Sequence, residues 1–404
     1  MKLTDKKEIL KMSLFFMLLY TISYVTRINY GAVISEIVKA EGMLKSDASL
    51  ALTTSAITYG IGQLLSGFLG DKINPKKLIF FGLLLTISMN LLLPFCGSAY
   101  AMSAAWGVNG IAQAFMWPPL VKIMTSLFTS EDYTKACMYV SWGGSVGAIL
   151  VYALAPVCIL VGGWHSIFLV SAACAALMAI FWIKKCPNIK QTTKSNDNKY
   201  MQKSKISAKI YIVIACLMLI IILQGILRDG VSTWMPSYIS ETFKLDNKIA
   251  ILTGVILPVF SILITKITET IYSHLIKCET FLAGTIFAIG AAASALLFLT
   301  NGKSPALSVF LAALLTGCMH GVNWIMTCMM PPKFGQYGKI SFMSGLLNFC
   351  TYIGSATSMY GIALFSEKAG WNATLVLWTA VALSGTAICY ILSIGKSHKS
   401  KIEF

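Results

Sequence analysis

The chain has 404 residues, of which 56% are hydrophobic and only 12% carry a charged side chain. A soluble protein of this length has about twice that share of charged residues, so the composition excludes an ordinary soluble enzyme. The net charge of +16 would suit nucleic acid only if the lysines were gathered on a folded soluble surface, and this chain offers no such surface.

Long apolar runs follow one another along nearly the whole sequence, and each has the roughly 20 residues that a helix needs to cross a bilayer. We predict twelve such helices. They begin near residues 10, 47, 77, 100, 134, 164, 208, 248, 280, 304, 340 and 371. The sequence therefore predicts an all-α, multi-pass membrane protein and no enzyme.

A polar, lysine-rich stretch separates the first six predicted helices from the last six. We expect an N-terminal half over residues 1–185, a basic linker over 186–207 and a C-terminal half over 208–404. Assigning the N-terminus to the cytoplasm places most of the 32 Lys and Arg residues on that side, as the positive-inside rule requires. We therefore expect a protein of the cell (inner) membrane with both termini in the cytoplasm.

The chain has only two arginines, Arg27 and Arg228, and each lies in the first apolar segment of its half. A guanidinium at membrane depth is costly and keeps its proton, so it must be paired, hydrated or used. Its planar fork of donors suits a phosphate group bidentately. We interpret the pair as an anion clamp with one arginine from each half. The alternative is that each arginine extends toward the outer surface.

The segment 67–77 resembles the signature Gly-x-x-x-Asp-Lys/Arg-x-Gly-x-Lys/Arg-Lys/Arg of the major facilitator superfamily, with Asn74 in place of the second glycine. Gly67 would allow two helices to approach closely. Asp71, followed by Lys72, would lie against the positive end of a neighbouring helix and close the cytoplasmic side. The alternative is a turn whose lysines only enforce topology.

Further elements lie around the arginines. They are Tyr20-x-x-x-Tyr24-x-x-Arg27 in the first helix, Trp117-Pro118-Pro119 in the fourth and Trp234-x-Pro236-x-Tyr238 in the seventh. Together they resemble the organophosphate:phosphate antiporter family, nearest its glycerol-3-phosphate transporter branch, from about residue 12 to 394. The resemblance implies two six-helix halves, a phosphoryl group bound by both arginines, and exchange of an organic phosphate for inorganic phosphate.

Three positions depart from that branch. Ile28 stands where the branch has Lys, Gln63 replaces a Lys on the second helix, and Gly144 replaces a His on the fifth. The expected cavity therefore lacks three positive charges, which favours a less charged anion or a larger phosphorylated substrate.

Other polar and aromatic side chains lie on the predicted helix faces that would line a cavity. The expected substrate-binding residues are Arg27, Arg228, Tyr20, Tyr24, Gln63, Trp117, His320, Asn348 and Tyr352. Asp229 and His320 are either proton-coupling groups or structural ones. Because neighbours on a helix point about 100° apart, Asp229 need not neutralise Arg228; it either couples protons or balances charge.

These observations predict a secondary carrier that moves an organic phosphate or related organic anion by alternating access. The alternatives are a proton-coupled carrier of a non-phosphorylated organic anion and a transporter-like substrate sensor. We expect a small anionic substrate, the lipid bilayer as the partner, function as a monomer, and no nucleic acid. The eleven cysteines are scattered, so we expect no cofactor and no metal.

Overall fold

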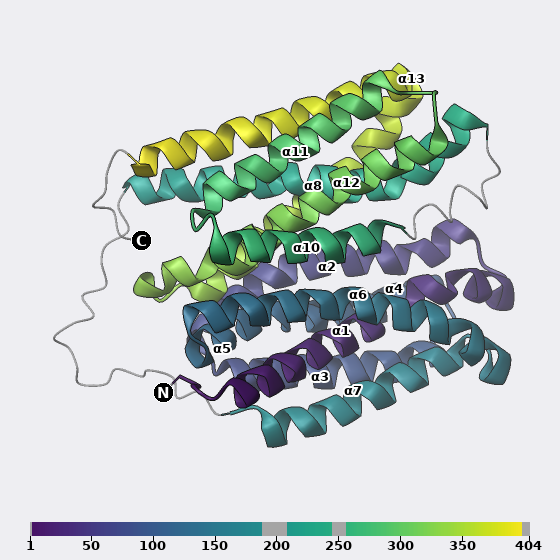
Figure 1. Ribbon diagram of the computed structural model, residues 1–404. Coiled ribbons are helices and arrows are strands. Elements are labelled where there is room, and N and C mark those ends of the chain that lie inside the picture. Colours follow the sequence, from purple (N-terminus) through teal and green to yellow (C-terminus); the bar gives the residue numbers. More distant parts are fainter. Residues whose placement is uncertain (1, 188–207, 245–255, 398–404) are drawn as a thin grey trace. The chain divides into compact units, whose positions relative to one another are not determined.

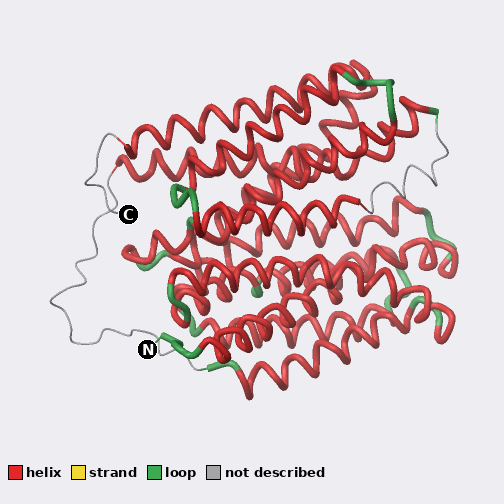
Figure 2. Tube along the Cα trace, viewed as in Figure 1, coloured by secondary structure: helices red, strands yellow, loops and turns green. Residues whose placement is uncertain are grey.

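The computed structural model describes residues 2–187, 208–244 and 256–397, and these residues contain helices but no strand (Figures 1 and 2). The predicted linker over 186–207 lies almost entirely outside the described residues. So does the start of the eighth predicted helix, near residue 248.

The first half of the sequence forms helices with the following bounds. They are α1 (Lys6–Glu41), α2 (Lys45–Lys72), α3 (Pro75–Leu92), α4 (Ala99–Ala114), α5 (Trp117–Leu127), α6 (Ser130–Gly162) and α7 (His165–Lys185). The fourth predicted span is thus two helices, because Pro118 and Pro119 lack the N–H groups that would continue α4. A short 3-10 turn, Leu93–Phe95, follows α3.

The second half continues the pattern. Its helices are α8 (Ala208–Phe243), α10 (Ile256–His274), α11 (Glu279–Leu299), α12 (Pro305–Trp324) and α13 (Ile340–Ser397). A π-helical turn, Ile325–Met329, and a 3-10 helix, Pro331–Tyr337, follow α12. The predicted eleventh and twelfth spans are both in α13, whose backbone leaves helical geometry at Gly370 (φ 78°, ψ 172°).

The chain divides into two compact units. The first unit is Met1–Ser204 together with Phe334–Leu346, and the second is Lys205–Lys333 together with Leu347–Phe404. The first residues of α13 therefore belong to the unit built mainly by the N-terminal half.

Within the first unit, α1 packs against α6 and α7, while α2 packs against α4. One part of its core is aromatic: the rings of Tyr30, Trp106 and Phe168 contact one another and are fully buried. Burying such large rings contributes strongly to packing. The three rings come from α1, α4 and α7, and this core therefore holds these helices together.

Within the second unit, α12 packs against α8, α10 and α11. Helix α8 also meets α13 at a glycine contact. A Cβ atom on Gly225 would overlap the carbonyl oxygen of Thr351, and one on Gly354 would overlap that of Ile222. Small residues at such crossings let helix backbones touch, so α8 and α13 are held at close range.

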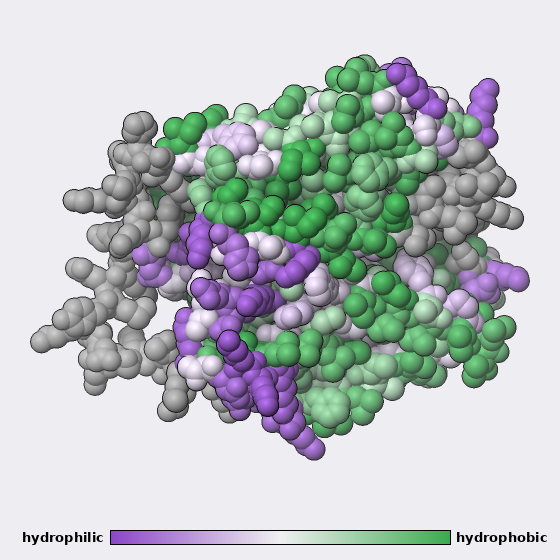
Figure 3. Space-filling model, viewed as in Figure 1, coloured by the Kyte–Doolittle hydropathy of each residue, from purple (hydrophilic) through white to green (hydrophobic). Residues whose placement is uncertain are grey.

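Nine helices of the described residues are long and apolar enough to cross a membrane. The three remaining predicted spans are α2, the broken α4–α5 pair and the first part of α13, residues 340–363. Proline shortens one of these spans, and Gly, Ser and Thr lower the hydropathy of the other two. Figure 3 shows apolar side chains over the helix flanks and hydrophilic ones gathered near the N-terminus, as a bilayer-spanning protein requires.

Candidate functional site

Arg27 lies among aromatic rings in the first unit. Its guanidinium carbon is 4.1 Å from the ring centre of Tyr24 and 4.8 Å from that of Tyr59. The Tyr20 ring contacts the rings of Tyr24 and Trp117, each at 5.2 Å between centres. The faces of aromatic rings attract a cation even where water is scarce. Four predicted site residues therefore come together, and Tyr59 joins them.

Gly144 makes room for the Tyr24 ring. A Cβ atom at Gly144 would lie 2.9 Å from the ring's Cζ, and one at Gly147 would lie 2.6 Å from the Cβ of Tyr24. The position at which the resembled branch has a histidine is therefore occupied by an aromatic ring of α1. The missing charge is replaced by a contact that supports Arg27.

A buried polar network fixes the backbone next to Arg27. The carbonyl of Thr26 accepts hydrogen bonds from Asn90 (3.3 Å) and Asn109 (3.1 Å), and its hydroxyl accepts one from Gln113 (2.8 Å). Asn29 donates to Asn90 at 2.8 Å and is fully buried. These bonds join α1 to α3 and α4 and hold it in place, while Oδ1 of Asn109 has no hydrogen-bond partner among the described residues.

Gln63 lies on α2 and is fully buried. Neither its Oε1 nor its Nε2 has a hydrogen-bond partner among the described residues, and the same holds for Nε1 of Trp117. A buried polar group without a partner costs about 1–3 kcal/mol. A conformation that brought a hydrogen-bonding group to the Gln63 and Trp117 side chains would therefore have a lower free energy.

The candidate gate lies at the end of α2. The Asp71 carboxylate accepts hydrogen bonds from the backbone N–H groups of Ser341 (3.0 Å) and Phe342 (2.8 Å), at the start of α13. Lys122 of α5 lies 3.7 Å from the same carboxylate and donates to the carbonyl of Gly70 at 2.8 Å. A carboxylate at this point satisfies orphan N–H groups and complements the helix dipole.

The other two residues of the predicted gate differ in their surroundings. A Cβ atom on Gly67 would lie 2.8 Å from the carbonyl oxygen of Ser341, and one on Gly345 would overlap the carbonyl of Gln63. Only glycine allows this crossing of α2 and α13. The Lys72 side chain is exposed, with its ammonium 3.7 Å from the ring centre of Phe68.

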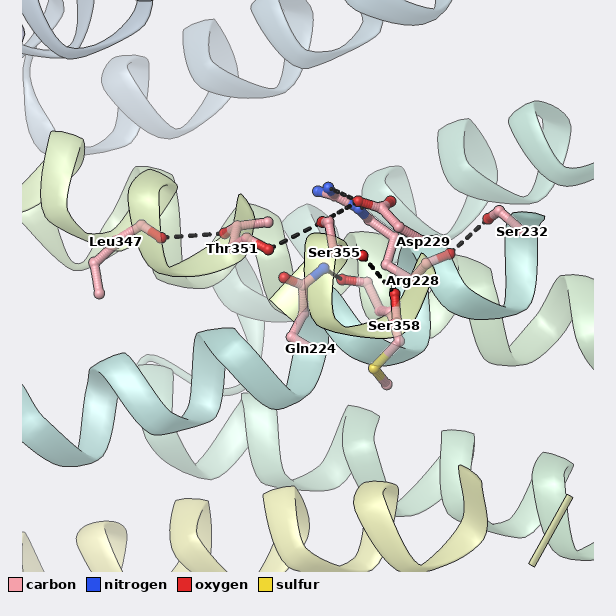
Figure 4. Close-up of polar contacts among 9 residues, drawn as sticks. Gln224, Arg228, Asp229, Ser232, Leu347, Thr351, Ser355 and Ser358 are labelled. Carbon is pink, nitrogen blue, oxygen red and sulfur yellow. Dashed lines mark hydrogen bonds and ion pairs between the residues drawn. The ribbon is translucent and has the colours of Figure 1, made fainter. Parts of the chain in front are cut away.

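Arg228 and Asp229 form a bidentate ion pair in the second unit. Nε of Arg228 lies 2.7 Å from Oδ1, and Nη2 lies 2.8 Å from Oδ2 (Figure 4). The 100° between neighbouring Cβ directions does not prevent this contact. The long side chain of Arg228 folds back to its neighbour. The Ser355 hydroxyl of α13 donates to Oδ2 of the same carboxylate.

His320 lies close to this ion pair. Its imidazole is within electrostatic range of both Arg228 and Asp229. Gln224, one turn before Arg228 on α8, donates to the carbonyl of Met319 at 3.1 Å. This bond ties α8 to α12 at the residue that precedes His320.

Asn348 and Tyr352 lie on α13 at half-buried positions. Ser355 follows Tyr352 by three residues and Asn348 by seven, so the three side chains share one face of the helix. Sequence analysis missed Ser355 and Gly345. The spacing of Ser355 from Asn348 and Tyr352, and the Ser341-x-x-x-Gly345 pattern, were signals that could have identified them.

Residues 16–359 match the sequence profile described as Major Facilitator Superfamily. Among curated proteins, "Membrane sensor protein UhpC" of Escherichia coli is 22% identical over 402 residues, 89% of this chain and 84% of that protein. Its Salmonella typhimurium counterpart is 24% identical, but the match spans only 56% of each chain. The "Glycerol-3-phosphate transporter" of Bacillus subtilis is 22% identical over 88% of this chain and 85% of its own.

Solved structures include a close match to the fold. The proton:xylose symporter XylE superimposes with a TM-score of 0.76 over 96% of both chains, at 13% sequence identity. At that identity the similarity concerns the fold alone. The predicted all-α membrane fold with the major facilitator architecture is thereby confirmed.

Proposed function

The chain belongs to the major facilitator superfamily, and we propose that this multi-pass secondary transporter exchanges an organic phosphate, or a related organic anion, for inorganic phosphate. The observation that carries the proposal is the environment of the two arginines. Arg27 on α1 lies against two aromatic rings, and Arg228 on α8 lies against a carboxylate and near His320. Each is the only arginine of its half.

The relatives support a phosphorylated substrate. The Bacillus subtilis relative is named as a glycerol-3-phosphate transporter, and several shorter matches are named as probable hexose phosphate transport proteins. Arginine at both positions supplies a fork of donors that fits a phosphoryl group. Ile28, Gln63 and Gly144 leave fewer positive charges than that branch has, so the substrate of this chain differs from glycerol 3-phosphate in charge or in size.

The carrier works by alternating access. Contact between Asp71 and the start of α13 closes the cytoplasmic side, and release of that contact opens it. Because most lysines fall in the predicted cytoplasmic loops, both termini lie in the cytoplasm. The protein functions as a monomer in the cell membrane.

Exchange of labelled phosphate in liposomes that hold the purified protein tests this proposal. We expect rapid uptake into liposomes preloaded with phosphate and little uptake into liposomes without internal anion. Uptake that needs no internal anion but follows an imposed pH gradient would contradict exchange. It would favour the proton-coupled carrier, for which Asp229, a carboxylate at membrane depth beside His320, is the supporting observation.

A substrate sensor is the second candidate, because two relatives are named as membrane sensor proteins. A sensor would bind the organic anion without exchanging it. Binding of labelled phosphate by the folded protein, with no exchange in liposomes under any gradient, would select this function over transport.

A further inference from the structure

One edge of the Arg228 guanidinium already holds an anion. Nε and Nη2 both donate to the Asp229 carboxylate, at 2.7 and 2.8 Å, and the two side chains are only 14% and 23% exposed. A carboxylate and a phosphoryl group use the same bidentate geometry on this edge. An incoming substrate and Asp229 therefore compete for the same donors.

Displacement of the carboxylate would leave a negative charge beside the bound anion. Like charges at that distance disfavour ionisation of both. The charged or titratable groups of the described residues that face Asp229 are Arg228 on α8 and His320 on α12. Helix α13 contributes the Ser355 hydroxyl, which donates to the carboxylate and supports its ionised form.

The charge of Arg228 is cancelled within its own unit, whereas Arg27 keeps its charge among aromatic rings. Asp229 cancels Arg228, while Arg27 lies among the rings of Tyr24 and Tyr59. At Gly144 the Tyr24 ring takes the space of a side chain that could carry charge. The Arg228–Asp229 pair of the second unit therefore offers an anion less positive charge than an arginine alone would.

We infer that Asp229 is a specificity-determining residue, a tethered competitor at Arg228 that makes the carrier select singly charged anionic groups over doubly charged ones. The inference rests on the proposed function, since Arg228 must bind the substrate. For a phosphate ester, the selected form is the singly protonated one, so the ester brings its own proton into the site. Ser355 holds the competitor in position.

Two oxyanions of fixed charge test this inference without a known substrate. Methyl sulfate carries one negative charge and sulfate two throughout the neutral pH range, and both are tetrahedral. Their ability to displace labelled phosphate from the purified protein is measured for the parent, Asp229→Asn and Asp229→Glu. We expect methyl sulfate to compete better in the parent and in Asp229→Glu, and sulfate to gain at least tenfold relative to methyl sulfate in Asp229→Asn.

Ser355→Ala keeps the carboxylate but removes its hydrogen-bond donor, so a smaller shift in the same direction is expected. This variant keeps the test decisive if Asp229→Asn does not fold. An unchanged ratio of sulfate affinity to methyl sulfate affinity across the parent, Asp229→Asn and Ser355→Ala would overturn the inference and leave the proposed function standing. Failure of folded parent protein to bind phosphate, sulfate or methyl sulfate would overturn the proposed function and the inference with it.

Discussion

Replacement of Asp71 by Asn should open the cytoplasmic side of the carrier. The Asp71 carboxylate is 9% exposed and accepts two backbone hydrogen bonds from the N-terminus of α13. A hydrogen bond to a charged group contributes about 1.5–3 kcal/mol, against about 0.5–1.5 kcal/mol for a neutral one. Replacing the charged acceptor therefore weakens the two bonds together by about 2 kcal/mol. This corresponds to a roughly 30-fold shift of the equilibrium from the closed toward the open conformation.

Ser66 is the position chosen to report that shift, because it directly precedes Gly67 on α2 and is fully buried. A Ser66→Cys variant is labelled from the cytoplasmic side with a maleimide that cannot cross the membrane, and the modified peptide is quantified by mass spectrometry. Labelling should be at least several-fold faster when Asp71→Asn is added. Glu131→Gln, the same kind of change at an exposed carboxylate of α6, is the matched control. Equal labelling rates with Asp71 and with Asn at position 71 would refute the reasoning.

Three further predictions concern packing. Gly345→Leu places a side chain where the Gln63 carbonyl lies, so the cytoplasmic side should stay open. The variant should still bind phosphate but should not exchange it in liposomes, and exchange at the normal rate would contradict the prediction. Gly144→Ala forces the Tyr24 ring to move, at a cost of about 1 kcal/mol. Phosphate should therefore bind about fivefold more weakly in an equilibrium binding assay. An unchanged affinity would show that the ring is not needed. Asn90→Leu removes three buried hydrogen bonds and should lower the free energy of unfolding by about 1–3 kcal/mol. The protein should then melt at a lower temperature in detergent. An unchanged melting temperature would argue against a stabilising role of the network.

The helices could be predicted from sequence because apolar runs of sufficient length leave few other structures in a bilayer. Even the break in the fourth span was present in the sequence, since Pro118 and Pro119 cannot continue α4. The Arg228–Asp229 pair was not predictable from helix geometry alone. A short side chain at i+1 points away, but a flexible guanidinium reaches back to it.

Partners from distant parts of the chain were harder to predict. Gly345 and Ser355 matter because α13 meets α2 at one end and α8 further along, and no local pattern specifies which helix lies opposite. The role of Gly144 likewise depends on the ring of Tyr24, 120 positions earlier in the numbering. Tertiary contacts, and not local propensity, decide these positions.

The central claim is that Arg27 and Arg228 both bind the transported anion. Arg27→Lys and Arg228→Lys keep the charge but lose the planar fork of donors, and Lys303→Arg makes the reverse change at an exposed loop residue. Exchange of labelled phosphate in preloaded liposomes should be lost in both arginine variants and kept in Lys303→Arg. Exchange at the parental rate in either arginine variant, with the protein folded and inserted, would contradict the claim.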